Sequence, residues 1–98
     1  MAIMENFDIK SFDKLFDAVL KLKSKEDCYK FFEDVCTIKE LQDVEQRLEV
    51  AYLLKDKKNY QEICKITGAS TATISRVNKC LLYGKGGYNL VIDNKESK

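Results

Sequence analysis

The segment 60–82 constrains the fold most, because its spacing predicts two short helices joined by a tight turn. A small residue, Cys64, stands four positions before Gly68, and an apolar pair, Ile74 and Val77, follows on the second helix. Helices that cross steeply need a small side chain at the crossing, and a sharp turn favours glycine, which adopts positive φ without a Cβ penalty. Ile74 and Val77 would pack the second helix onto the first. The segment therefore predicts a helix-turn-helix.

The remaining face of the second predicted helix is typical of a surface that faces a DNA groove. Short, polar and basic side chains allow close approach to base edges and phosphates. We therefore predict that DNA contacts come from Thr71, Ala72, Ser75, Arg76 and Lys79.

Charge is divided unevenly along the chain, although the net charge is only +1. Residues 1–54 carry eight basic and twelve acidic side chains, whereas residues 55–88 carry seven basic and two acidic ones. The basic part coincides with the predicted motif, where phosphates would need it, and adds Lys65 to the candidate DNA contacts. A charged stretch is usually only a solvated face, but its coincidence with the motif favours the functional interpretation.

The residue types argue against metal binding and catalysis. The chain has no histidine, and none of its cysteines stands two to four positions from another, so we expect no metal site. The cysteines lie among apolar residues, which predicts small buried thiols in a reducing compartment. No nucleophile adjoins a likely base, and no glycine loop follows a strand, so we expect neither an enzyme nor a resident cofactor.

The chain is expected to be a cytoplasmic protein without a membrane partner. Ninety-eight residues make one domain at most. No apolar run is long enough to span a bilayer, and the first ten residues lack the core of a signal peptide.

Three helices are predicted before the motif. The first covers about 11–22, the second begins at Ser24, and the third covers about 38–54 behind a Thr37-x-x-Glu40 capping box. The third helix becomes apolar nearly all round towards its C-terminal end, so it must be covered on more than one face. A homodimer with interwoven helices covers it readily, and a central helix in a monomer core is the alternative.

The domain organisation follows from these elements. Asn59 and Glu62 are spaced to cap the first helix of the motif, and Gly84 is placed to end the second. We predict a single helical domain over 1–88, with dimerisation helices over 10–54 and the helix-turn-helix over 59–83. Residues 89–98 are expected to form a flexible tail.

The segment 68–76, GASTATISR, resembles the Trp repressor superfamily, which has GAGIATITR there. The likeness extends upstream to the Thr37 helix and Arg47, and the glycine-rich segment 83–88 favours the YerC/YecD branch of Trp-repressor-like proteins. The resemblance implies an all-α, intertwined homodimer that presents two helix-turn-helix units to double-stranded DNA.

The resemblance also implies roles for single positions. Thr71, Ala72 and Ser75 fall where the family meets base edges, and Thr73 falls where it meets phosphate. Gln61 stands where the repressor has a basic DNA contact and Cys64 where it has a lysine, so the repressor's own operator is not expected to carry over.

An effector pocket is implied by Thr37, Arg47 and Arg76, which match the residues that line the repressor's tryptophan site. Arg47 and Arg76 are the only arginines of the chain, and a guanidinium stacks on rings and grips carboxylates as lysine cannot. Val77 replaces a glycine against which the indole lies, at a cost of about 1–3 kcal/mol in a packed site, which disfavours tryptophan. The alternative ligand is another small anionic effector.

Each arginine also has a simpler interpretation. Arg47 could pair with Glu45 or Glu49, and Arg76 could touch only phosphate. For the whole chain, the sequence favours a homodimeric, sequence-specific DNA-binding transcription regulator. The alternative function is a protein-interaction module that keeps the fold without reading DNA.

Overall fold

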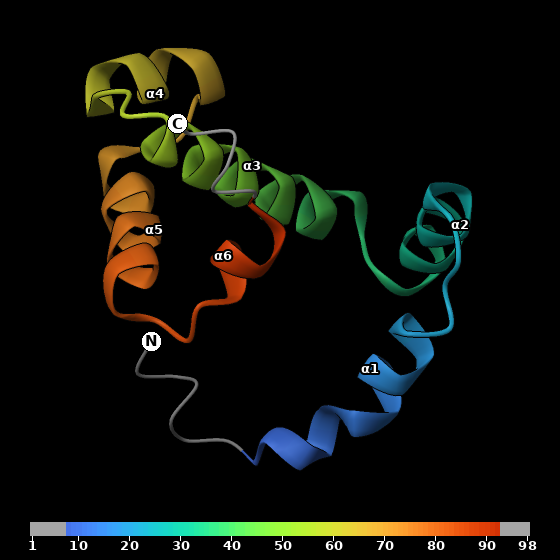
Figure 1. Cartoon of the computed structure of the whole chain (residues 1–98). Coiled ribbons are helices and arrows are strands. Elements are labelled where there is room, and N and C mark those ends of the chain that lie inside the picture. The colour runs from blue at the N-terminus through green and yellow to red at the C-terminus, as the bar shows by residue number, and fades with distance from the viewer. Residues whose placement is uncertain (1–7, 93–98) are drawn as a thin grey trace. The chain divides into compact units, whose positions relative to one another are not determined.

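The computed structural model describes residues 8–92, and every regular element in that range is helical (Figure 1). This confirms the all-α prediction. The elements, in chain order, are η2 (Ile9–Phe12), α1 (Asp13–Val19), α2 (Lys25–Val35), α3 (Ile38–Lys55), α4 (Tyr60–Thr67), α5 (Thr71–Tyr83) and α6 (Gly87–Val91). Within residues 8–92 no helix combines the length and apolarity that a bilayer crossing requires.

The chain divides into two compact units between Leu41 and Gln42. This boundary lies inside α3, whereas the sequence suggests a division between the dimerisation helices and the motif near 54–59. The assignment of 10–54 to dimerisation stays a prediction.

The first predicted helix is present but shorter and divided. The 3₁₀ helix η2 begins after Asp8, whose carboxylate accepts a hydrogen bond from the Lys10 N–H at 3.0 Å. The α-helix then ends at Val19, short of the predicted position 22. The N–H of Leu22 donates to the carbonyl of Val19 at 3.0 Å, an i→i+3 bond that tightens the chain into a turn.

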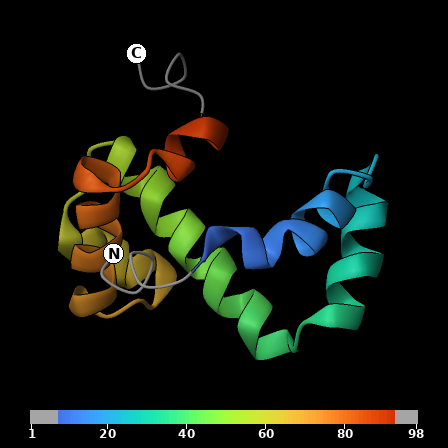
Figure 2. The ribbon, with the colours of Figure 1, turned by 90° about the horizontal axis from the view of Figure 1, so that it is seen from below.

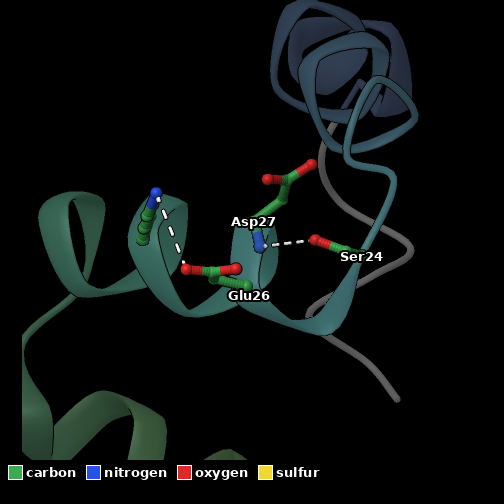
Figure 3. Close-up of polar contacts among 4 residues, drawn as sticks. Ser24, Glu26 and Asp27 are labelled. Carbon is green, nitrogen blue, oxygen red and sulfur yellow. Dashed lines mark hydrogen bonds and ion pairs between the residues drawn. The ribbon is translucent and has the colours of Figure 1, made fainter.

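Helix α2 begins where the sequence predicts, with Ser24 as its cap (Figure 3). The Ser24 hydroxyl oxygen accepts from the Asp27 N–H at 3.0 Å, and the Asp27 carboxylate accepts from the N–H of Lys23 at 3.0 Å. The reciprocal bond thus reaches one residue further back than in a standard capping box. Glu26 and Lys30 form an exposed ion pair at 3.9 Å, which contributes at most about 1 kcal/mol.

Helix α3 confirms the predicted Thr37–Glu40 capping box. The Thr37 N–H donates to the Glu40 carboxylate at 2.8 Å, and the Glu40 N–H donates to the Thr37 hydroxyl oxygen at 3.0 Å. Val50 and Ala51 are fully buried on this helix, while Tyr52, on the side opposite Val50, is exposed. The helix is therefore apolar on more than one face, as its sequence predicts.

The core of the second unit lies where α3 meets α4, α5 and α6, and Figure 2 shows these helices from a second side. Helices α3, α4 and α5 and the turn between α4 and α5 each contribute at least one buried side chain, and Ile92, the C-cap of α6, adds another. The buried residues are Val50, Ala51, Ile63, Ala69, Ile74, Val77 and Ile92.

Two predictions need correction. The tail expected from 89 onward is wrong over 89–92, because α6 continues to Val91 and Ile92 is only 5% exposed in the core; positions 93–98 lie outside the described residues. The expectation of buried thiols is also wrong. Cys28 is exposed, and Cys36, Cys64 and Cys80 are only partly buried, all as free thiols. The exposure of Cys28 accompanies a first unit in which neither α1 nor α2 has a buried side chain.

Candidate nucleic-acid interface

Helix α4, the first helix of the motif, is fixed at both ends by the residues that the sequence indicates. Asn59 accepts from the Glu62 N–H at 2.9 Å and donates its own N–H to the Glu62 carboxylate at 3.0 Å, which completes a capping box. Gly68 ends the helix with φ of 75°, in the left-handed region. Both predictions are confirmed.

Thr67 holds the turn of the motif together. Its hydroxyl donates to the Ile63 carbonyl at 2.7 Å and accepts from the Ala69 N–H at 3.0 Å, while its carbonyl accepts from the Gln46 side-chain amide of α3 at 3.1 Å. The turn is therefore tied both to α4 and to the long helix. Sequence reasoning missed Thr67, although a threonine directly before a turn glycine was the available signal.

Ser70 is the N-cap of α5, and sequence reasoning missed this role too. Its hydroxyl accepts from the Thr73 N–H at 3.1 Å and donates to the Thr73 hydroxyl oxygen at 3.1 Å. A serine before the first apolar-periodic residue was the signal. Thr73 is partly buried here, and its predicted contact with phosphate stays a prediction.

The two faces of α5 are sharply different. Ile74 is 0% exposed and Val77 only 1% exposed, so both lie in the core, as the spacing predicts. The opposite face is exposed and carries polar, small and basic side chains: Thr71, Ala72, Ser75, Arg76 and Lys79.

Gln61 and Lys65 are exposed on α4, one helical turn apart. Lys65, Arg76 and Lys79 form no ion pair with any carboxylate of residues 8–92. Three cationic side chains of the motif are thus available to an anion in the solvent, as phosphate contact requires.

The predicted effector residues have different surroundings. Arg47 on α3 hydrogen-bonds through its guanidinium to the hydroxyl of Tyr88 on α6. The alternative pairing with Glu45 or Glu49 is absent from the described part of the chain. Arg76 is exposed on α5 and shares no bonding partner with Arg47 among residues 8–92, and Thr37 belongs to the first unit, where its hydroxyl caps α3.

Tyr88, the partner of the predicted effector residue Arg47, was not singled out by sequence reasoning. Burial against the core raises the pKa of its phenol, the charge of Arg47 and its hydrogen bond lower it, and Cys80 raises it; the net effect is upward. The phenol is therefore neutral at physiological pH. Only a tertiary contact brings Arg47 and Tyr88 together, so no local pattern could have indicated the pair.

Comparison with known proteins agrees with this geometry. The family model for the Trp repressor protein matches residues 10–96. The uncharacterised protein YerC of Bacillus subtilis (strain 168) is 52% identical over 84 residues, which cover 86% of this chain and 81% of that protein.

Two solved structures share the fold. A TrpR-like protein from Eubacterium eligens ATCC 27750 has a TM-score of 0.81 at 50% identity and covers 86% of this chain and 87% of its own. A proposed Trp repressor from Staphylococcus aureus has a TM-score of 0.86 at 42% identity, with coverages of 100% and 97%. The family match spans most of the sequence and the fold agrees. The chain therefore belongs to the Trp repressor family, whose members are transcription regulators and not enzymes.

Proposed function

We propose that this protein is a homodimeric, sequence-specific DNA-binding regulator that inserts α5 into the major groove. The observation that carries the proposal is the difference between the two faces of α5. Its apolar side is anchored by Ile74 and Val77, and its polar and basic side faces solvent. A recognition helix needs both, because its orientation must be fixed while its outer side chains reach the bases.

Residue roles follow from position on this face. Thr71, Ala72 and Ser75 lie towards the N-terminal part of α5, from which recognition helices usually contact base edges. The charged side chains and the remaining polar ones would hold the phosphate backbone and set the register: Gln61, Lys65, Thr73, Arg76 and Lys79.

Dimerisation would supply two reading helices, spaced about 34 Å apart, one turn of DNA. Support comes from the first unit, where apolar side chains such as Phe16 (57% exposed) and Leu20 (82% exposed) face solvent on the single chain. Large apolar side chains that gather on an exposed surface are usually covered by a partner, and the second copy would use residues 10–54.

A small anionic effector could act through Thr37, Arg47 and Arg76. The arginine on α3 and the arginine on the recognition helix would each offer a planar cation to a carboxylate. Because Val77 fills its position in the core, the indole of tryptophan would find its place occupied.

Selection of bound sequences from random double-stranded DNA tests this function. We expect recovered fragments to contain two half-sites related by a two-fold axis. The logarithm of the binding constant should fall linearly with the logarithm of the salt concentration. Fragments without two-fold symmetry would contradict the dimeric reading mode. The absence of salt-dependent binding would favour the protein-interaction module instead.

A further inference from the structure

The link between α3 and α4 holds a lysine in a conformation that favours glycine. Lys57 has φ of 69°, and it is the only non-glycine residue with a positive φ in the part of the chain that the structure describes. Backbone hydrogen bonds from this residue and the next close the end of α3. At the end of α4 the chain places Gly68 in the same conformation, without a Cβ penalty. At Lys57 it instead keeps a long cationic side chain and the strain that comes with it.

The link carries positive charge that the described chain does not neutralise. Lys57 and Lys58 are exposed and Lys55 is partly buried. None of the three forms an ion pair with a carboxylate of residues 8–92. These three lysines and Asp56 give the segment a net charge of +2. The exposed pair is therefore available to an anion in the solvent.

Helix electrostatics explains only part of this charge. A cation near the C-terminal end of a helix is favourable, which suits Lys55 in the last turn of α3. Lys58, however, directly precedes Asn59, the N-cap of α4, where the positive end of the helix dipole disfavours a cation. Lys57 adds backbone strain of its own. A purely structural role therefore does not explain lysine at positions 57 and 58.

The link lies next to the surface that we propose for DNA contact. Gln61, an exposed residue of α4 with a proposed phosphate contact, follows Lys58 by three positions. Figure 1 shows the link entering the start of α4, at the end of α3 where α5 also lies. In helix-turn-helix proteins the first helix crosses the phosphate backbone while the second enters the groove. Because α4 has eight residues and is about 12 Å long, its start meets phosphates away from the turn into α5.

We propose that Lys57 and Lys58 form a second phosphate-binding element, which holds the DNA backbone beyond the groove that α5 reads. The inference rests on the proposed DNA-binding function and extends it to residues outside both helices of the motif. Phosphate contacts carry no base information, so the pair adds affinity without changing sequence preference. The strain at Lys57 is retained because a cation is needed there.

Salt-dependent DNA binding by the full chain tests this element. Each lysine that neutralises a phosphate adds about 0.9 to the steepness with which the logarithm of affinity falls against the logarithm of salt concentration. Lys57→Gln combined with Lys58→Gln should therefore lower the steepness by about 1.8 for each bound chain. Affinity at low salt should fall by the same factor for a selected site and for a scrambled site.

Two further variants separate position and strain from charge. Lys21→Gln combined with Lys23→Gln is the matched control, because it removes two exposed lysines from the link between α1 and α2. It should keep the wild-type steepness. Lys57→Gly removes the strain together with one charge. It should raise the urea midpoint of unfolding while lowering the steepness by about 0.9 for each bound chain.

Wild-type steepness in the double variant at 57 and 58, or an equal change in the control, would overturn the proposal and leave the proposed function intact. A loss confined to the selected site would also overturn it, because it would indicate base contacts. Lys57→Gly that is no more stable than the wild type would refute the retention of strain for charge. If the double glutamine variant does not fold, Lys57→Gly combined with Lys58→Gln decides. A wild type that binds no DNA would contradict the proposed function and this element together.

Discussion

At the scale of single residues, the exposed face of α5 separates base reading from backbone binding. Ser75 has a short hydroxyl side chain that can bond to a base edge, whereas Lys79 carries a cation suited to phosphate. Ser75→Ala should relax specificity at one base position by about 1–3 kcal/mol. Lys79→Ala should weaken binding to all sequences and reduce the salt slope by about one unit. Titrations with a selected site and a scrambled site at two salt concentrations distinguish the two effects, and identical changes would contradict these roles.

The phenol of Tyr88 gives a second prediction at this scale. Its pKa is raised above 10.0 by burial and by Cys80, which together outweigh the opposing effect of Arg47. Because the neutral form is favoured in the folded state, this contribution to stability is complete below the ordinary tyrosine pKa. It is lost as pH rises through the higher folded value. The difference between ultraviolet titrations of the wild type and Tyr88→Phe isolates this group and should have its midpoint above 10.0. A midpoint below that value would contradict the buried contact.

At the scale of elements, the two glycines that end the motif helices serve different purposes. Gly68 has a positive φ with open space around the position of a Cβ, whereas a Cβ on Gly84 would lie 2.5 Å from the Cys80 carbonyl oxygen. Gly68→Ala should destabilise the fold by about 1–2 kcal/mol through backbone strain alone. Gly87→Ala is the control, because its position is open and its φ is not in that region; it should stabilise by about 0.4–1 kcal/mol. Urea unfolding measures both, and equal midpoints would contradict the assignment of strain to Gly68.

The sequence predicts most of these elements because their signals are local. The capping boxes at Thr37 and Asn59, the turn glycine and the α5 stripe each lie within a few positions, and all are present in the structure. Thr67 and Ser70 were missed although their signals are local, whereas the other features that sequence reasoning missed depend on contacts between distant segments. Helix α6 has glycine at its start and no side-chain cap, so only its docking onto the core stabilises it. The Arg47–Tyr88 bond joins residues about forty positions apart, and no periodicity could predict it.

At the scale of the whole molecule, the first unit is the part whose large apolar side chains lack a core of their own. No side chain of α1 or α2 is buried, although both helices carry large apolar residues. The residues concerned are exposed on the described chain: Phe12, Leu15, Phe16, Leu20, Tyr29 and Val35. A chain of 98 residues gains much of its stability from any further surface it buries. The second unit, by contrast, has its own core and the reading helix.

A charge placed on the apolar side of α1 should therefore separate the two copies without unfolding the second unit. We expect Phe16→Asp to convert a dimer into a monomer in light scattering, because a buried unpaired carboxylate costs several kcal/mol. Because the monomer lacks the second reading helix, its affinity for DNA should fall by far more than the loss of one phosphate contact would cause. Lys14→Ala changes the net charge by the same amount at an exposed position of α1 and should leave the dimer intact. A Phe16→Asp protein that remains dimeric, or a wild type that is monomeric at micromolar concentration, would contradict the use of this surface for dimerisation.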